Sequence, residues 1–433
     1  PWPDPCAGAL AGLVQAMSAA VDRRPMSTTE RLWIVAEHLH PPFVNQLVLE
    51  AAPGDDLSES RLKDAMAAVS DAHPGTRLRA AGVLGWSHYV ADAPRPPVLT
   101  VDGQGWDARS PAGANFLRHP LPVATGPTTG ILRVEGPVQR LVIRTHHATM
   151  DGGGTSAMAR DLFRALRGEP LEGSNVSSPV DVDIAKTLSP PPFKVRDHRF
   201  GAPTGAVRGS LSETTWRRRT YQGSARKLLP RVVLALYQVS RQWTELPLSI
   251  SVPVDLRRHR PDLRSTANLT GAVFLDLDVD LVPGDGDQEA PADRIARVLA
   301  ARAASGDAGK GLIAGQPLRW VPLGWLRGLG RHFMHKEARA GRYPSSGVIS
   351  NLGRMDLPSL SCSGFTSQRA FWIPPASEGQ RLFLTLSGGP EGVELCCTMA
   401  EAFASDGRLD ALLDGVLAFL DNGPAPSPTT GAS

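Results

Sequence analysis

The stretch His146-His147-Ala148-Thr149-Met150-Asp151-Gly152-Gly153-Gly154 decides how this sequence is interpreted. It follows the β-branched run Leu141-Val142-Ile143, which predicts a core strand over 139–145 that leads directly into the two histidines. After the glycines, apolar residues recur at helical spacing as far as Gly168, which is placed to end a helix. The predicted local order is strand, glycine turn, helix.

Two adjacent histidines at the end of a strand cannot face the same pocket, because successive side chains alternate between the faces. We therefore expect one catalytic and one structural histidine, and assign His147 to catalysis and His146 to structure. An imidazole suits a proton-accepting role, because its ordinary pKa of about 6.5 leaves it neutral near physiological pH. His147 is thus the expected general base.

The three glycines predict a second catalytic element. Backbone N–H groups at a helix N-terminus lack partners within the helix and favour anions, so Gly152, Gly153 and Gly154 are expected to form an oxyanion site. Asp151 leaves two interpretations open: it orients His147 as a triad member, or it holds the turn by pairing with an arginine. Arg257, which follows an apolar strand over 246–254, is the predicted partner.

The rest of the chain mixes helices and strands. A helix capped by Ser58, with apolar positions at Leu62, Ala65, Met66 and Val69, lies among strands expected over 46–51, 76–83 and 97–101. Further strands are predicted over 215–221, 246–254, 272–279 and 347–350, and a hairpin over 381–386 and 393–399. Helices are predicted over 228–243 and 293–303 and after Asp406. A length of 433 residues favours two lobes.

Composition excludes several classes of function. A net charge of +3 over the whole chain gives no basis for nucleic-acid binding. Apolar runs such as 232–239 are too short to span a membrane, and the N-terminus lacks a secretory signal, so a soluble cytoplasmic protein is expected. The four cysteines show no Cys-x-x-Cys spacing, and a metal site at His147 and Asp151 would need a third ligand for which no cluster is visible. We expect no metal.

A helix is also predicted over 321–339. The expected inward residues are Trp325, Leu326, Leu329 and Phe333, and the expected outward residues are Arg327, Arg331, Lys336 and Arg339. Two interpretations stay open: an ordinary packing helix with a solvated basic face, or a basic surface that docks an acidic carrier protein or the phosphates of CoA. The run Arg217-Arg218-Arg219 is open to the same two interpretations.

At these motifs the chain resembles the superfamily of CoA-dependent acyltransferases, which includes nonribosomal peptide synthetase condensation domains, polyketide-associated acyltransferases and wax ester synthases. The resemblance covers most of the length. It depends on His146-His147-x-x-x-Asp151-Gly152, on 253–257 followed by Asn268, and on 350–353. It implies an α/β fold of two chloramphenicol acetyltransferase-like lobes with an active-site tunnel between them. The segments expected are an N-terminal extension 1–22, an N-terminal lobe 23–175, a linker 176–210, a C-terminal lobe 211–422 and a disordered tail 423–433.

The resemblance also implies roles for single residues. His147 would be catalytic, supported by His146, Asp151, Gly152, Gly153, Arg257 and Asn351, with Asn351 approaching the tunnel from the second lobe. The expected enzyme is a free-standing acyltransferase of natural-product biosynthesis. Its donor would be a thioester of CoA or of a phosphopantetheinyl carrier protein, its acceptor an amine or alcohol, and no cofactor would be bound permanently. The alternative is the same fold reused as a cyclase or isomerase, or as a carrier-protein docking domain.

Overall fold

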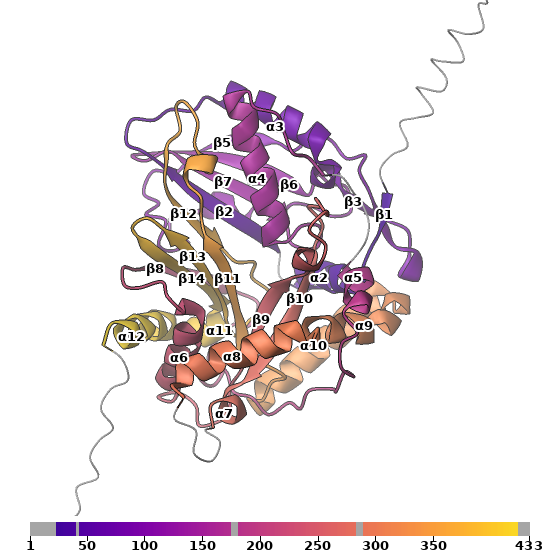
Figure 1. The fold of residues 1–433 in the computed structure, drawn as a ribbon, viewed down its shortest axis with the longest axis vertical. Coiled ribbons are helices and arrows are strands. Elements are labelled where there is room, and N and C mark those ends of the chain that lie inside the picture. The colour runs from indigo at the N-terminus through magenta and orange to yellow at the C-terminus, as the bar shows by residue number, and fades with distance from the viewer. Residues whose placement is uncertain (1–22, 40–42, 175–180, 283–288, 423–433) are drawn as a thin grey trace, which may run out of the picture.

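The computed structural model describes residues 23–39, 43–174, 181–282 and 289–422. The expected N-terminal extension and C-terminal tail lie outside these ranges, as does part of the expected linker. Two large mixed sheets organise the chain, one in the upper and one in the lower half of the view (Figure 1).

The first sheet has the strand order β12-β2-β7-β6-β5. Its strands are β2 (Val44–Ala51), β5 (Val98–Asp102), β6 (Thr129–Glu135), β7 (Arg140–His146) and β12 (Ser367–Ile373). Helices α3 (Glu59–Ala72) and α4 (Gly152–Arg167) pack together beside this sheet, and their apolar stripes share one core with the strands. Both β2 and β7 are buried along their whole length, which explains why the β-branched run before the histidines is continuous rather than alternating.

The second sheet has the order β10-β9-β11-β13-β14-β8. Its strands are β8 (Thr214–Tyr221), β9 (Ser249–Asp255), β10 (Thr270–Asp276), β11 (Gly347–Arg354), β13 (Phe383–Gly389) and β14 (Gly392–Ala400). Helices α6 (Leu228–Ser240) and α12 (Arg408–Asn422) share a large apolar core with it. The predicted hairpin is present as β13 and β14, although Gly388 and Gly389 belong to the first strand rather than to the turn.

The remaining elements are short or peripheral. A small sheet joins β1 (Arg23–Pro25), β3 (Arg79–Ala81) and β4 (His88–Val90). The other helices are α2 (Thr28–Leu39), α5 (Asp181–Thr187), α7 (Leu277–Asp280), α8 (Pro291–Ala304), α9 (Lys310–Ala314), α10 (Leu323–Ala340) and α11 (Glu401–Ala404). Helix α5 lies within the segment expected to be an irregular linker, and the strand predicted over 76–83 is a 3₁₀ turn over 74–77 followed by the short β3.

Several local predictions are confirmed. Ser58 caps α3 by accepting a hydrogen bond from the Arg61 N–H, and Gly168 ends α4 in the left-handed conformation, with φ of 73°. Strand β12 shows what local patterns cannot: it comes late in the chain, yet pairs antiparallel with β2 and completes the first sheet. The two sheets are therefore linked by the chain crossing from one to the other.

The prediction for α10 was wrong in one respect. Leu326 is buried, but Trp325, Leu329 and Phe333 are 71%, 50% and 48% exposed. The helical period correctly identified the stripe, but the period alone does not say which side of a helix is covered. The arginine run 217–219 is an ordinary part of the fold, because Arg218 is buried beside Glu394 while Arg217 and Arg219 bind Asp410 on α12.

Candidate active site

The two histidines lie where β7 ends. His146 is the last residue of the strand and is fully buried, and its Nδ1 accepts a hydrogen bond from the Ala148 N–H at 3.1 Å. His147 is partly exposed. The alternation of side chains along the strand therefore separates them as predicted: the first stabilises the turn that follows, and the second is accessible.

Aromatic rings enclose His147. The Trp33 ring of α2 is stacked against the imidazole at a centroid distance of 5.4 Å, and Phe43 lies at the same distance in a tilted arrangement. The His147 N–H also donates to the Phe43 carbonyl at 3.0 Å, which ties the backbone of the two segments together. These contacts fix the plane of the imidazole.

Asn45, on β2, is a site residue that the sequence analysis missed. Its Nδ2 lies 3.0 Å from the Nδ1 of His147 and donates to the Met150 carbonyl at 2.9 Å. The Met150 carbonyl near the ring acts to raise the pKa of His147. An amide nitrogen only donates, so Nδ1 of the imidazole accepts from Asn45 in this arrangement. No sequence signal marks Asn45, because its role arises from the pairing of β2 with β7.

Burial lowers the pKa of His147 from 6.5 to about 4. The negative charge of Asp151 acts in the opposite direction and raises the pKa, but it does not outweigh the burial. The imidazole is therefore neutral at physiological pH, the state required of a proton acceptor.

The Asp151 carboxylate is fully engaged by partners other than His147. Both of its oxygens bind the Arg257 guanidinium, at 3.0 and 3.1 Å, so the pair expected from the sequence is present. The carboxylate also accepts from the Gly154 N–H, the Leu269 N–H and the Thr270 hydroxyl, all at 2.8–2.9 Å. Burial raises the pKa of Asp151, but the charge of Arg257 and these hydrogen bonds outweigh it, and the pKa lies below its ordinary value.

This pair joins the two halves of the chain. Arg257 directly follows β9, and Leu269 and Thr270 lie where β10 begins. Arg257 also binds Asp255, at 3.0 Å, and the Ser265 carbonyl, at 2.9 Å. Asn268 donates from its side chain to the His147 carbonyl at 2.8 Å. The loop between β9 and β10 therefore holds the whole turn from His147 to Gly154.

Gly152, Gly153 and Gly154 differ in whether their backbone N–H groups are available to an oxyanion. Gly154 cannot serve as an oxyanion donor, because its N–H caps α4 through Asp151, so this part of the prediction was wrong. A Cβ at Gly154 would lie 2.2 Å from the Thr266 carbonyl oxygen, and the residue is thus required for the close approach of the β9–β10 loop. Gly152 and Gly153 begin α4, where backbone N–H groups have no helical partner.

Asn351 lies on β11 and is exposed, and its side-chain oxygen accepts from the Gly353 N–H at 3.1 Å. Its neighbour Leu352 makes the closer approach, because a Cβ at Gly152 would lie 2.9 Å from the Leu352 Cδ2. The strand thus reaches the start of α4 through Leu352 while Asn351 stabilises its own turn.

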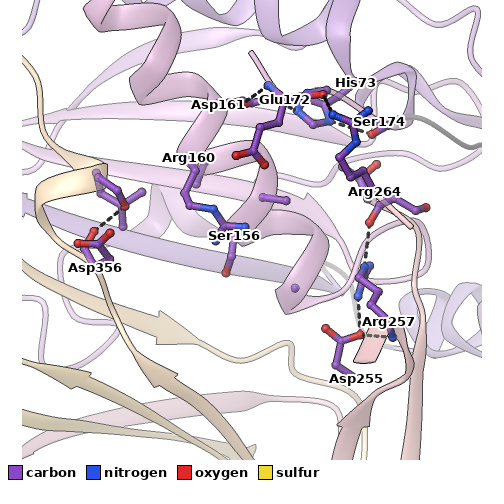
Figure 2. A pocket seen from close by; sticks show the side chains of 18 of the residues that line it. His73, Ser156, Arg160, Asp161, Glu172, Ser174, Asp255, Arg257, Arg264 and Asp356 are labelled. Carbon is purple, nitrogen blue, oxygen red and sulfur yellow. Dashed lines mark hydrogen bonds and ion pairs between the residues drawn. The ribbon is translucent and has the colours of Figure 1, made fainter. Parts of the chain in front are cut away.

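A cavity of about 430 Å³ lies beside Arg257 and Asp255 (Figure 2). One face of α4, the segment 263–266 and the end of β11 line it, and it extends from Gly153 and Arg257 to His73. At that far end, His73 binds Asp161 at 2.7 Å and the Ser174 hydroxyl at 2.8 Å. Asp161 also accepts the N–H groups of Glu172 and Gly173, so this cluster fastens the loop after α4 to the end of α3.

Within the described residues, no group of three or more His, Cys, Asp or Glu side chains could hold a metal ion. In the same part of the chain, no helix is long and apolar enough to cross a membrane.

Comparison with known proteins gives the fold. No family model and no curated protein matches the chain. Solved structures do match: the condensation domain of the monacolin K polyketide synthase MokA has 13% identity, covers 92% of this chain and 97% of its own, and has a TM-score of 0.56. The chain has the condensation-domain fold.

Two further structures share the condensation-domain fold. The starter condensation domain of rhizomide synthetase RzmA, in complex with C8-CoA and Leu-SNAC, has 13% identity over 94% of this chain and 95% of its own, with a TM-score of 0.58. TRI101 of F. graminearum, in complex with coenzyme A and T-2 mycotoxin, has 15% identity over 91% and 97%, with a TM-score of 0.57. The predicted α/β class is confirmed by this likeness.

Proposed function

We propose that the protein is an acyltransferase that moves an acyl group from a thioester to an amine or alcohol. The donor is a thioester of CoA or of a phosphopantetheinyl carrier protein, and the reaction belongs to natural-product biosynthesis. The observation that carries the proposal is the partly exposed, neutral imidazole of His147, held by Asn45 and Met150 at the end of a buried strand. The folds of the CoA-bound neighbours support the choice of donor.

The chemistry follows from which ring nitrogen is available. The Asn45 contact places the ring lone pair on Nδ1 in this structure, because an amide nitrogen only donates. Action as a base at Nε2 requires the other tautomer, in which the Asn45 amide turns away and the Nδ1 proton faces the Met150 carbonyl. Nε2 accepts the proton of the acceptor amine or hydroxyl as that group attacks the thioester carbonyl. The tetrahedral intermediate then collapses, the C–S bond breaks, and the proton is returned to the departing thiolate.

The charge that develops on the carbonyl oxygen needs donors. Gly152 and Gly153, at the start of α4, supply backbone N–H groups for this purpose, and each donor of this kind contributes about 3 kcal/mol to transition-state stabilisation. Asp151 and Arg257 act as positioning residues, because their side chains bind one another and the β9–β10 loop.

Intact mass spectrometry of acyl-CoA and acyl-carrier donors with a panel of amines and alcohols tests the proposal. We expect an acyl mass on one acceptor class and release of the free thiol. His147→Ala should abolish turnover and keep the fold, whereas His119→Ala, which replaces an exposed histidine, should leave the rate unchanged. A His147→Ala protein that retains the wild-type rate on its true substrate pair would contradict the general-base role.

A further inference from the structure

Helix α10 exposes an apolar stripe to solvent. Trp325, Leu329 and Phe333 are spaced four residues apart and are all at least 48% exposed. At 3.6 residues per turn they fall within a sector of about 80° on the helix. Figure 1 shows α10 in the half of the molecule away from α3. Soluble proteins rarely leave neighbouring large apolar side chains exposed to water, so these three side chains indicate an interaction surface.

Further exposed apolar side chains lie on the segments next to α10. Trp320, just before α10, is 51% exposed and meets Trp86 edge to face at a centroid distance of 5.0 Å, and Trp86 is itself 68% exposed. Of the thirteen large apolar side chains exposed in the described residues, eight lie on α10, α2 and the turns over 84–86 and 316–320 or next to them, so the exposure is concentrated in one region: Leu32, Val83, Trp86, Leu318, Trp320, Trp325, Leu329 and Phe333. We call these eight residues the aromatic surface.

Positive charge surrounds the aromatic surface. Helix α10 contains four Arg or Lys residues and one carboxylate, Glu337, whereas the whole chain is nearly balanced, with 46 basic and 43 acidic residues. Glu337 faces away, toward His198 at 3.2 Å and Arg381 at 3.9 Å. Lys336 falls within the apolar sector, about one turn beyond Phe333, and Arg339 lies about 40° outside it. Arg331 pairs with Glu378 at 3.3 Å, whereas Arg327, Lys336 and Arg339 have no carboxylate partner among the described residues. The surface therefore combines exposed aromatic rings with uncompensated cations.

We propose that the aromatic surface docks the protein on an anionic lipid membrane. Helix α10, Leu323–Ala340, contains no Ser, Thr, Asn, Gln or Tyr. Its other polar side chains are Arg, Lys and His, and its one carboxylate, Glu337, faces away, so the helix offers a partner mainly cationic donors. A lipid headgroup layer instead favours Trp and Phe at the boundary with the acyl chains and Lys or Arg against the phosphates. The composition of α10 fits the lipid surface.

The docking surface adjoins the active site. Leu323, at the start of α10, and Trp33, which is stacked against His147, both pack on the apolar cluster that includes Ala148. Docking through α10 would therefore place the side of the active site formed by Trp33 close to the membrane. The proposal does not depend on the proposed function, because its test measures binding alone.

Vesicle co-sedimentation tests the docking. The full chain should sediment with vesicles of 30% phosphatidylglycerol in phosphatidylcholine, and less with phosphatidylcholine alone, and its binding should weaken as NaCl rises from 0.1 to 0.5 M. We expect Trp325→Ala with Phe333→Ala to reduce the partition coefficient at least tenfold. Lys336→Gln with Arg339→Gln should reduce it about twenty-fivefold, at about fivefold per charge. The matched controls, Leu99→Ala and Lys63→Gln on the first lobe's edge strand and α3, should bind as the wild type does.

Every other outcome overturns the proposal. Equal sedimentation with both vesicle types, or binding that survives the Trp325 and Phe333 changes, contradicts it once circular dichroism shows that each variant is folded. A wild type that ignores vesicles but binds an acidic carrier protein through the same residues would make this a protein-docking surface. Sedimentation velocity that shows a dimer lost in the variants would make it a self-association surface. The His147→Ala protein should bind vesicles normally, which separates this test from that of catalysis.

Discussion

Removal of Asp151 provides the sharpest test of how the site is built. The side chains of Asp151 and Arg257 are 4% and 16% exposed, so each is largely shielded from water. Deleting one partner of such a pair costs about 3–5 kcal/mol, because the other charge is left buried and unpaired. Asp151→Ala also leaves the Gly154 and Leu269 N–H groups and the Thr270 hydroxyl without their acceptor. Arg257 keeps Asp255 and the Ser265 carbonyl, so part of its charge stays compensated, and we expect a loss within this range.

Arg257→Ala should cost about as much as Asp151→Ala. Asp151 would keep its three other donors, so part of its charge stays compensated. The double variant should fall short of the sum of the single losses by about 2 kcal/mol, because the pair is already broken after the first change. Against a total stability of about 5–15 kcal/mol, these are large losses.

Urea unfolding of the wild type, both single variants and the double variant measures this coupling, with kcat/KM determined on the same samples. Arg79→Ala is the matched control: its pair with Asp92 is bidentate but about a third exposed, and its loss should cost less than 1 kcal/mol. Three results together would refute the reasoning: the losses in free energy of unfolding are additive, Asp151→Ala is as stable as the wild type, and only its kcat/KM falls. Asp151 would then act on His147.

Three further outcomes follow from the same geometry. His146→Ala should lower the unfolding midpoint, because it removes a fully buried ring that accepts the Ala148 N–H, and an active His147→Ala beside a folded, inactive His146→Ala would reverse the two roles. Asn45→Ala should lower kcat about tenfold or more with little change in KM, because it loosens the imidazole and not the substrate; an unchanged kcat excludes this role. The pH profile of kcat/KM should lose its base only as the pH falls through about 4, since protonation removes the lone pair, and a titration of that base near 6.5 would contradict the burial of the ring.

Local chemistry allowed much of this protein to be predicted from its sequence. The caps at Ser58 and Gly168 and the strand–turn–helix order around the histidines depend on neighbours along the chain, and all are present. The separation of His146 from His147 follows from side-chain alternation in a strand, which needs no tertiary information. The Asp151–Arg257 pair was predictable because a buried carboxylate requires a partner.

Contacts between distant segments decided the rest. Asn45 reaches His147 only because β2 pairs with β7, and β12 completes the first sheet from more than two hundred residues away. The N–H of Gly154 was unavailable because Asp151 caps the helix. For α10, the 3.6-residue period fixed which apolar side chains share a stripe, but only the packing of the helix against its neighbours determined that Leu326 is covered and Trp325 faces solvent. Periodicity specifies relative direction around an axis, and tertiary packing sets what lies in that direction.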